Sequence, residues 1–239
     1  MRFLSVIVPT YNESANIGGL LRALPPLLAP WDYEIIVVDD NSPDGTAGLV
    51  NQLRKDRLFE GRLRLLRRTR DRGLSPAVVE AFEWSTGRLL AVLDADRSHD
   101  ETLLPRLVES VGRDAWVAVG SRRVPGGGAD QWPWYRQWTS SLATGVARAL
   151  LGVALKDPMS GFFALRRDVF EKSRSRLRPR GYKILLEILV RARVPADRVR
   201  EFPYVFKDRR QGYSKLSPGV AGAFVRQLLG LAADRWRNR

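Results

Sequence analysis

The sequence predicts an α/β fold in which a mostly parallel sheet is flanked by helices and followed by an amphipathic C-terminal helix. Over residues 1–121, short β-rich runs alternate regularly with segments of helical spacing, which is the pattern of βαβ units. The chain has 239 residues, of which 44% are apolar, and this is enough for one sizeable domain with a packed core.

Five apolar runs predict the strands of the first half: FLSVIVP, YEIIVVD, RLRLLRR, RLLAVLD and AWVAVG. Four segments with helical spacing lie between them: IGGLLRALPPLL, TAGLVNQLRKD, SPAVVEAFEWS and TLLPRLVESV. Open parallel sheets bind ligands at the carboxyl ends of their strands. Because PTYNE, DDNSPDG, DADRSHD and GSRR follow four of the predicted strands, we expect the functional site at that end.

The character of the chain changes after Gly120. PGGGADQ predicts a flexible connection, and the segment that follows it predicts an aromatic-led helix. DPMSGFFALRRDVF predicts a turn, a short strand and a helix start; YKILLEILVRA predicts an apolar helix, and VREFPYVF a strand.

The last segment has the spacing of an amphipathic helix. One helical stripe of residues 217–239 carries Val220, Phe224, Leu228 and Leu231, while Arg226 faces away. A helix that packs on the core has the same spacing, but the basic surroundings favour a helix at a membrane interface. No segment reaches the ~20 apolar residues that span a bilayer, so a membrane-associated form would lie on the surface.

Composition removes several classes of function. The chain has no cysteine and only one histidine, His99. Thiolate metal sites and disulfides are therefore excluded, and a Ser-His-Asp triad would have to use His99. Neither of the phosphate-binding motifs G-x-G-x-x-G and G-x-x-x-x-G-K-[ST] occurs. Their absence from the sequence disfavours a dinucleotide-dependent oxidoreductase and a P-loop NTPase.

The net charge of +14 is unevenly distributed. Residues 1–121 hold 15 Lys and Arg against 17 Asp and Glu, whereas residues 122–239 hold 25 against 9. The second half therefore predicts an anionic partner: a membrane surface, a phosphorylated acceptor or a nucleic acid. The signatures of RNP, zinc-finger and helix-turn-helix modules are missing, and this disfavours nucleic acid.

The stretch LAVLDADRSHDE holds two aspartates one residue apart. In an extended chain Asp94 and Asp96 project to one side while Ala95 projects to the other, and two carboxylates on one side suit a bound cation. The alternative is a solvated turn with Asp as a helix N-cap. His99 beside this turn is expected to form hydrogen bonds or cap a helix rather than act as a catalyst.

A set of motifs spread along the chain resembles the family-2, inverting GT-A glycosyltransferases, and within them the dolichol-phosphate (polyprenyl-phosphate) mannosyltransferases. The motifs are VIVPTYNE, VVDDNSPDGT, VLDAD, GSR, DPMSGF and YVFKDRRQGYSKL. The first two motifs and the DAD are shared widely among sugar transferases, and the late R-x-x-G-x-S-K-L signature narrows the match to the mannosyltransferases. The resemblance runs from about Phe3 to Leu216 and implies a Rossmann-like GT-A domain over residues 1–216, with residues 217–239 as the membrane-interface helix.

The resemblance also implies roles for individual residues. The base and ribose of a sugar nucleotide would be held by Pro9, Tyr11, Glu13, Val38 and Asp40. The diphosphate and its Mg²⁺ or Mn²⁺ would be held at Asp94, Ala95 and Asp96, with Ser98 as a further metal ligand.

Five further residues complete the implied site. Arg209 and Lys215 would lie on a loop that closes against the phosphates, and Arg122, Arg136 and Ser140 would face the acceptor phosphate, with Arg122 also near the sugar nucleotide. The implied catalytic residues are Asp94, Asp96, Arg122, Arg209 and Lys215. The chain departs from the family pattern at Ser98, where some members have glutamine, and at Arg97, where an apolar residue is usual.

The expected activity is therefore a metal-dependent transfer of a hexose, most simply mannose from GDP-mannose, onto a polyprenyl or dolichyl monophosphate. The expected location is the cytoplasmic face of a membrane, where the protein is peripheral, with an anionic surface or a membrane subunit as partner. The alternatives are a UDP-sugar polyprenyl-phosphate transferase, a metal-dependent nucleotidyltransferase and, from another class, a basic nucleic-acid-binding protein.

Overall fold

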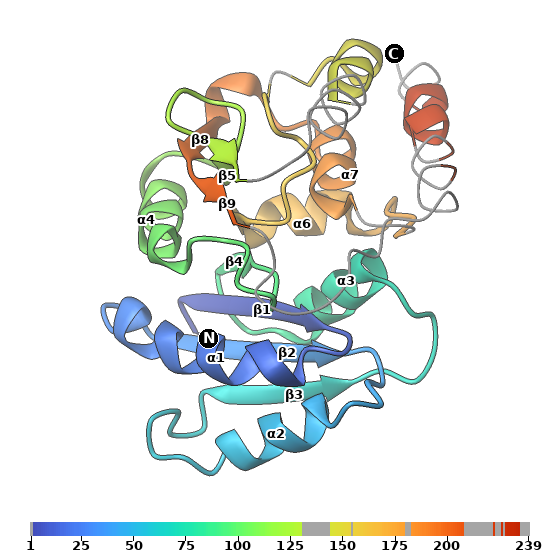
Figure 1. Cartoon of the computed structure of the whole chain (residues 1–239). Coiled ribbons are helices and arrows are strands. Elements are labelled where there is room, and N and C mark those ends of the chain that lie inside the picture. Colours follow the sequence, from blue (N-terminus) through green and yellow to red (C-terminus); the bar gives the residue numbers. More distant parts are fainter. Residues whose placement is uncertain are drawn as a thin grey trace.

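The structure is a computed structural model that describes residues 2–130, 144–153, 155–179, 183–207 and 228–234, together with Gly222 and Arg226. Its centre is a 7-stranded sheet of order β3-β2-β1-β4-β7-β5-β8, shown with its covering helices in Figure 1. The strands are β1 (Leu4–Thr10), β2 (Tyr33–Asp39), β3 (Leu63–Arg67), β4 (Leu89–Val92), β5 (Val117–Ser121), β7 (Phe163–Arg166) and β8 (Val199–Pro203).

The parallel core of the sheet is formed by the runs that predicted strands. β1 pairs in parallel with β2 and β4, β2 with β3, and β5 with β8. The predicted mostly parallel α/β fold is therefore confirmed. The carboxyl ends of β1, β2, β4 and β5 lie at one end of the sheet, which we call the carboxyl end.

One strand runs against the others. β7 pairs antiparallel with both β4 and β5 and so separates them, with Phe163 opposite Val92 on one side and Val119 on the other. The prediction that VREFPYVF forms one strand is wrong, because β8 ends at Pro203 and β9 (Val205–Phe206) pairs instead with β6 (Gly128–Ala129) in a second, two-stranded sheet.

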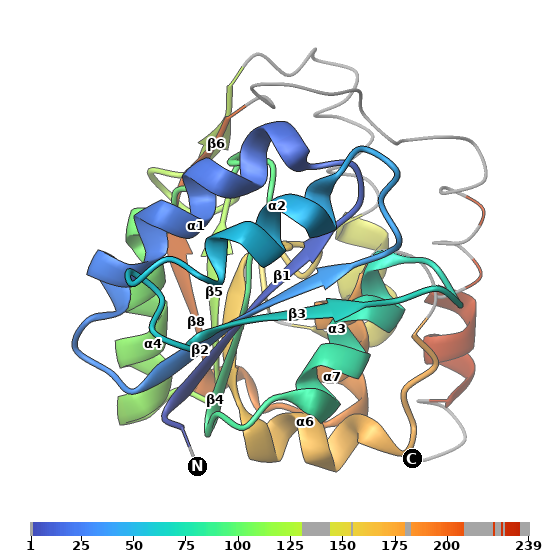
Figure 2. The same cartoon turned by 90° about the horizontal axis from the view of Figure 1, so that it is seen from below.

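Helices cover both faces of the sheet, as Figure 2 shows. One face carries α1 (Ser14–Leu28), α2 (Thr46–Leu53) and α4 (Leu104–Arg113), and the other carries α3 (Leu74–Trp84), α6 (Arg167–Arg174) and α7 (Ile184–Arg191). Two short 3₁₀ turns, η1 (Glu101–Leu103) and η2 (Ala196–Arg198), precede α4 and β8. No described helix is both long and apolar enough to cross a bilayer.

Alternation along the strands explains this two-sided core. In β1, Leu4, Val6 and Val8 point into the cluster under α1, α2 and α4, whereas Ile7 points into the cluster under α3, α6 and α7. Strands buried on both faces read as continuous apolar runs, and the YEIIVVD strand is buried at every position.

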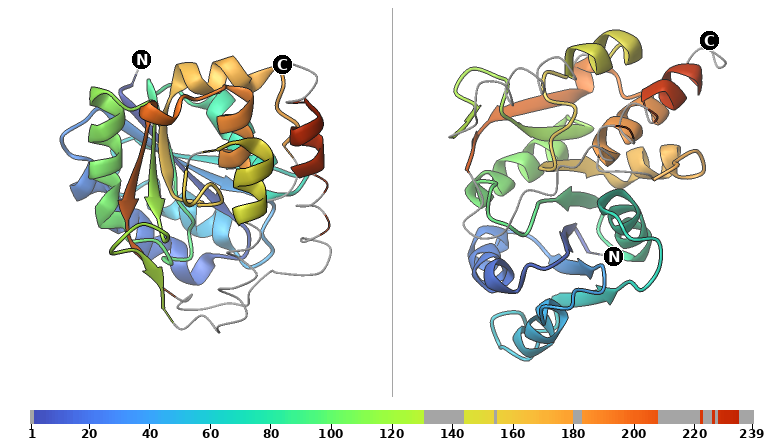
Figure 3. Two further views of the ribbon diagram at one scale, coloured as in Figure 1. Left: turned by 90° about the horizontal axis from the view of Figure 1, so that it is seen from above. Right: turned by 45° about the vertical axis from the view of Figure 1, so that its right-hand side comes forward.

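A third, smaller cluster involves the end of the chain. Leu228 and Leu231, 5% and 2% exposed, pack with Leu186 of α7 and with the helical residues 144–151, while Leu229 is 62% exposed. In Figure 3 the red helix of residues 228–234 lies beside α7. Asp234 extends this contact by a 3.0 Å ion pair with Arg191. The described part of the predicted stripe thus faces the protein.

At the opposite, amino end of the sheet, a carboxylate joins three segments. Glu34 is 1% exposed; its Oε1 accepts hydrogen bonds from the Ser5 hydroxyl (2.7 Å) and the Thr86 amide (2.6 Å), and its Oε2 pairs with Arg64 at 2.5 Å. Gly87 lies so close to β1 that a Cβ there would fall 2.4 Å from the Ser5 nitrogen. The β3-to-β4 connection is therefore fixed against the sheet.

Candidate active site

Two loops at the carboxyl end of the sheet are joined to each other. The loop after β1 donates three backbone N–H groups to the loop after β2: Asn12 to the Ser42 hydroxyl, Glu13 to the Thr46 hydroxyl and Ser14 to the Asp44 carboxylate, at 3.0, 3.0 and 2.9 Å. Although burial opposes it, hydrogen bonds from Thr46 and Ser14 lower the pKa of Asp44 to about 2. The two loops therefore form one unit.

The residues expected to hold a sugar nucleotide lie on this unit. Pro9 and Val38 are register partners in β1 and β2, and the Asp40 amide donates to the Thr10 carbonyl at 3.0 Å. Tyr11 lies under the guanidinium of Arg72, with 5.5 Å between the Arg72 Cζ and the ring centroid. The carboxylate of Glu13 accepts a 2.9 Å hydrogen bond from Asn16.

Asp40 ties the loop after β2 to the loop before α3. Its Oδ2 accepts a 2.8 Å hydrogen bond from the Gly73 amide, and its Oδ1 pairs with Arg68, which is 5% exposed. Arg68 also pairs with Glu80 of α3 at 2.7 Å. A φ of 144° at Gly73, a region that favours glycine, brings this amide to Asp40.

Asp94 and Asp96 lie just after β4, which is the neighbour of β1 in the sheet. Asp96 is 3% exposed, and its Oδ1 accepts hydrogen bonds from the amide and hydroxyl of Ser98, at 3.0 and 2.6 Å. The side chain of Asp94 is 30% exposed, whereas Ala95 is buried at 2%. The helix cap that follows is supplied by Asp100, whose side chain accepts from the Thr102 amide, so neither Asp94 nor Asp96 is the N-cap.

His99 supports this turn from behind. Its Nδ1 accepts a 3.1 Å hydrogen bond from the Asp94 backbone N–H, and its Nε2 lies 3.6 Å from the Asp94 Oδ2. The ring stacks on Phe162 with centroids 5.1 Å apart and meets Tyr204 and Phe206 edge-on. Burial lowers the pKa of His99 to about 4, and Arg122 adds to that decrease, although the charges of Asp96 and Asp157 oppose it. His99 is therefore neutral at physiological pH.

Arg122 follows β5 and is held by a buried carboxylate. Its Nε and Nη2 donate to the two oxygens of Asp157 at 2.7 and 2.9 Å, a fork geometry, and its amide donates to the same carboxylate at 3.2 Å. Asp157 is 0% exposed, and although burial opposes it, Arg122 holds the pKa of Asp157 below its ordinary value. The GSR and DPMSGF motifs therefore meet in this ion pair.

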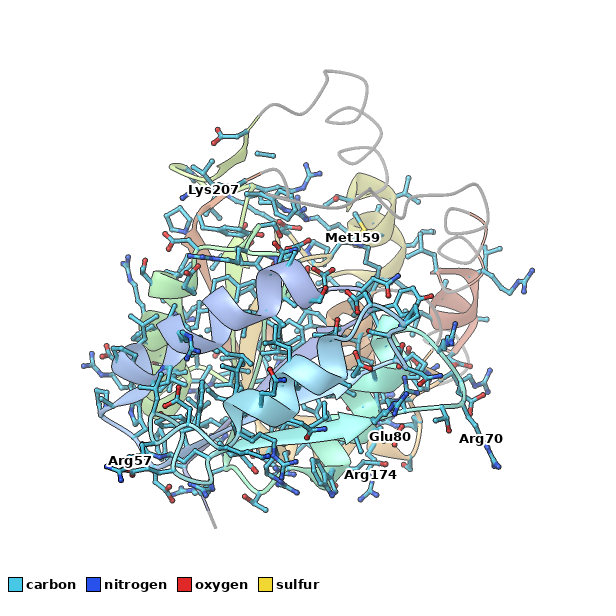
Figure 4. All side chains as sticks on the ribbon, turned by 60° about the horizontal axis from the view of Figure 1, so that its bottom comes forward. Arg57, Arg70, Glu80, Met159, Arg174 and Lys207 are labelled. Carbon is cyan, nitrogen blue, oxygen red and sulfur yellow. The ribbon has the colours of Figure 1, made fainter. Side chains whose placement is uncertain are left out.

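The DPMSGF turn also contacts Asp94, because β7 enters the sheet at its carboxyl end. A Cβ on Gly161 would lie 3.1 Å from the Asp94 Oδ2, so a glycine lets the turn approach the carboxylate. The Ser160 hydroxyl donates to the Gly120 carbonyl at 2.7 Å. Lys183, just before α7, donates to the Met159 carbonyl at 3.2 Å. Figure 4 places Met159 and Lys207 toward one end of the molecule, and Arg57 and Arg174 toward the other.

Sequence reasoning missed Asp157 and Lys183 as members of this site. The position of Asp157 in DPMSGF is a signal that was available, whereas Lys183 lies in a basic run of ordinary appearance. The predicted residues Arg136, Ser140, Arg209 and Lys215 lie outside the described residues, as do Val220 and Phe224 of the predicted stripe.

The arrangement suits a cation that shares its coordination with a ligand. Within the described ranges, no group of three or more His, Cys, Asp or Glu side chains is placed to enclose a metal ion. Two carboxylates completed by phosphate oxygens and water are the usual donor set of Mg²⁺. Asp94 and Asp96 fit that pattern, since both are hard oxygen donors and Asp94 is accessible.

Comparison with known proteins gives a family and relatives. The model for Glycosyl transferase family 2 matches residues 5–174. The chain is 39% identical over 230 residues to the dolichol-phosphate mannosyltransferase of Pyrococcus furiosus, covering 95% of this chain and 63% of that protein, so it spans less than two thirds of that relative. It is 37% identical over 237 residues to the polyprenol monophosphomannose synthase of Mycolicibacterium smegmatis, covering 96% and 85%.

Among solved structures, the fold is similar to that of a Mycobacterium tuberculosis glucosyl-3-phosphoglycerate synthase. That protein was crystallised with Mn²⁺, UDP-glucose and phosphoglyceric acid; the TM-score is 0.65 at 20% identity, covering 98% of this chain and 79% of that one. The likeness concerns the fold and agrees with the predicted GT-A architecture.

Proposed function

Because the chain belongs to glycosyl transferase family 2, we propose that it transfers mannose from GDP-mannose to a polyprenyl or dolichyl monophosphate, with inversion at the anomeric carbon. The observation that carries the proposal is the 39% identity, over 95% of this chain, to a protein named for mannosyl transfer to dolichol phosphate. The geometry of the site supports the proposal as well. Asp94, Asp96 and Arg122 lie at the same end of the sheet, where the phosphates of the donor and of the acceptor would have to approach each other.

The joined loops after β1 and β2 are suited to the donor nucleotide. Pro9, Tyr11, Glu13, Val38 and Asp40 would hold base and ribose there, and the bonds through Asp44 and Arg68 would keep these positions fixed before the nucleotide arrives. A site formed in advance loses less entropy when it binds its ligand.

The diphosphate of the donor would lie at Asp94, Ala95 and Asp96. These two aspartates, with Ser98 as a further oxygen ligand, would hold Mg²⁺ or Mn²⁺, and such a cation neutralises charge on a departing diphosphate. His99 and Gly161 would keep Asp94 in place, the first through its backbone and the second by close approach. Arg209 and Lys215 would add positive charge on a closing loop.

The acceptor should need no general base from the protein. A phosphate monoester has its second pKa near ~6, so at neutral pH its oxygen is already an anionic nucleophile. Arg122, Arg136 and Ser140 would then orient this phosphate, with Arg122 fixed by Asp157. His99, which is neutral and bonded to the Asp94 amide, would have a supporting rather than a proton-transfer role.

The lipid acceptor would bring the protein to the cytoplasmic face of a membrane as a peripheral protein. Residues 122–239, with 25 basic against 9 acidic side chains, would face anionic lipid, alone or with a membrane subunit. The packing of Leu228 and Leu231 on α7 limits what residues 228–234 can insert into a membrane, and Leu229, which is exposed, is one side chain of this segment that could contact lipid. Vesicle binding that weakens at high salt would support this placement.

A substrate panel tests the proposal directly. Detergent-solubilised polyprenyl phosphate is incubated with each radiolabelled sugar nucleotide, with and without Mn²⁺, and lipid-linked sugar is extracted. We expect product from GDP-mannose and none in excess EDTA. If product formed only with UDP-glucose, the donor would be UDP-glucose and not GDP-mannose. Release of pyrophosphate would instead indicate a nucleotidyltransferase.

A further inference from the structure

Lys183 lies in the active site although it belongs to none of the motifs that define it. It immediately precedes α7, and its Nζ donates a 3.2 Å hydrogen bond to the Met159 carbonyl. Burial lowers the pKa of Lys183 to about 8; Arg122 lowers it further, while Asp157 and Asp94 act in the opposite direction. The ammonium is thus charged at neutral pH and within electrostatic range of three site residues.

The turn that Lys183 contacts connects the same residues. Met159 lies between Asp157 and Gly161 in the sequence. Asp157 accepts hydrogen bonds from Arg122, and Gly161 lies close to the Asp94 carboxylate. A positive charge on this turn is therefore beside both the proposed metal ligands and the proposed acceptor contacts. The β5 and β7 segments hold this arrangement through the bond from Ser160 to the Gly120 carbonyl.

The balance of charge gives Lys183 a role. The fork of Arg122 is directed at the two oxygens of Asp157, so much of its positive charge is matched inside the protein. Asp94 and Asp96 would be matched by a divalent cation. Lys183 places a further positive charge on the turn that joins these pairs, at a position where a dianionic phosphate has to be brought close to a diphosphate.

We propose that Lys183 binds the phosphate of the acceptor and so makes the enzyme select a phosphate monoester over an alcohol. This inference rests on the proposed transfer to a polyprenyl phosphate. An ammonium is a compact point charge that can follow a phosphate as it approaches the sugar, and it complements the fixed fork of Arg122.

Three variants separate the charge of Lys183 from its contact with the turn. Lys183→Gln keeps a donor for the Met159 carbonyl but has no charge, Lys183→Met removes both, and Lys183→Arg keeps the charge. Lys156→Gln is the matched control, because the side chain of Lys156 is exposed and the described contact of that residue is its backbone N–H to Glu201. Thermal unfolding of each variant shows whether it folds.

The first readout is steady-state kinetics with acceptor varied at saturating GDP-mannose. Loss of a hydrogen bond to a charged group corresponds to a change of about tenfold or more, so we expect Lys183→Gln and Lys183→Met to raise the acceptor KM by that factor. Lys183→Arg should recover part of the loss, and Lys156→Gln should match the wild type. A wild-type KM in Lys183→Gln would overturn the proposal and leave only a contact with the turn.

The second readout needs no turnover. Calorimetry measures the binding of a short-chain polyprenyl phosphate and, separately, of GDP-mannose with Mn²⁺. We expect Lys183→Gln to weaken lipid phosphate binding about tenfold while the donor Kd stays within about twofold. Equal weakening of both ligands would overturn the inference. If the wild-type protein itself binds no polyprenyl phosphate, the proposed function fails rather than the role of Lys183.

Discussion

Carboxylates lie at both ends of the sheet, and they differ in their burial and in what their oxygens contact. At the amino end, Glu34 is 1% exposed and bonds to Ser5, Thr86 and Arg64. At the carboxyl end, the side chain of Asp94 remains 30% exposed while its backbone is fixed by His99. Glu34 stabilises the fold, because its oxygens are bonded to other residues of the protein. Asp94 is fixed through its backbone N–H, and its partly exposed carboxylate can contact a ligand.

A second pair of residues repeats this difference with arginines. Arg167 at the amino end donates to three backbone carbonyls, of Phe82, Ser85 and Gly87, and so closes the C-terminus of α3. Arg122 at the carboxyl end binds a carboxylate that is itself part of a functional motif. We infer that the amino end stabilises the fold and that the carboxyl end holds the site of the proposed chemistry.

The largest expected effect tests the carboxyl end. Asp94→Asn should lower kcat a few hundredfold, about 3–4 kcal/mol of transition-state stabilisation, because the donor diphosphate loses an anionic metal ligand as it departs. Turnover with GDP-mannose measures this, and thermal unfolding serves as the control. A loss of thermal stability together with activity would show that Asp94, like Glu34, stabilises the fold.

The next effect tests the amino end. Glu34→Gln should lower the free energy of unfolding by about 2 kcal/mol, because a buried charge-assisted pair with Arg64 is replaced by a neutral contact. Chemical denaturation measures the loss, and the kcat of the variant at a temperature well below its unfolding should equal that of the wild type. Impaired turnover in folded protein would contradict the division between the two ends.

The pH dependence of stability sharpens the same comparison. Although burial opposes it, hydrogen bonds from Thr86, Ser5 and Arg64 keep the pKa of Glu34 below its ordinary value of 4.5. A lowered folded-state pKa gives stability that is present above the unfolded value and lost as the pH falls through the folded one. The difference in melting temperature between wild type and Glu34→Gln should therefore shrink on acidification below about pH 4.5.

The smallest expected effect concerns His99. His99→Asn keeps an acceptor for the Asp94 amide but cannot serve as an imidazole base, so kcat should fall by less than about tenfold, whereas loss of a general base costs 10²–10⁴. The acid limb of the kcat/KM profile should stay near pH ~6, set by the acceptor phosphate, since the pKa of His99 is lowered to about 4. Loss of the limb in His99→Asn would assign proton transfer to this residue.

The sequence predicted the parallel half of the fold because each strand there is a continuous apolar run. The run YEIIVVD coincides with β2, and the aspartates after β4 lie at the predicted end of the sheet. The position of β7 was not predictable, since a run such as FALR carries no information about which strands it will separate or in which direction it will run. Register and partner choice depend on contacts far away in the chain.

The position of the candidate site residues in the fold was predictable where a motif contains them. Pro9, Val38, Asp40, Asp94 and Asp96 lie together at the carboxyl end because their strands do. The ion pair between Arg122 and Asp157 joins residues 35 positions apart, and neither residue type is unusual in a basic chain. The position of Lys183 follows from where α7 begins, and that requires the packed structure.

The insertion of β7 between β4 and β5 has a consequence for synthesis on the ribosome. Residues 1–121 contain the five strands predicted for the first half, yet β4 and β5 are not neighbours in the folded sheet, and each keeps an unpaired edge until residues 163–166 emerge. A nascent chain paused before that point would leave the β7-facing edges of both strands unpaired beside an apolar core, which is the kind of state that chaperones bind. The turn that brings Asp157 to Arg122 and Gly161 to Asp94 therefore emerges together with the strand that covers those two edges.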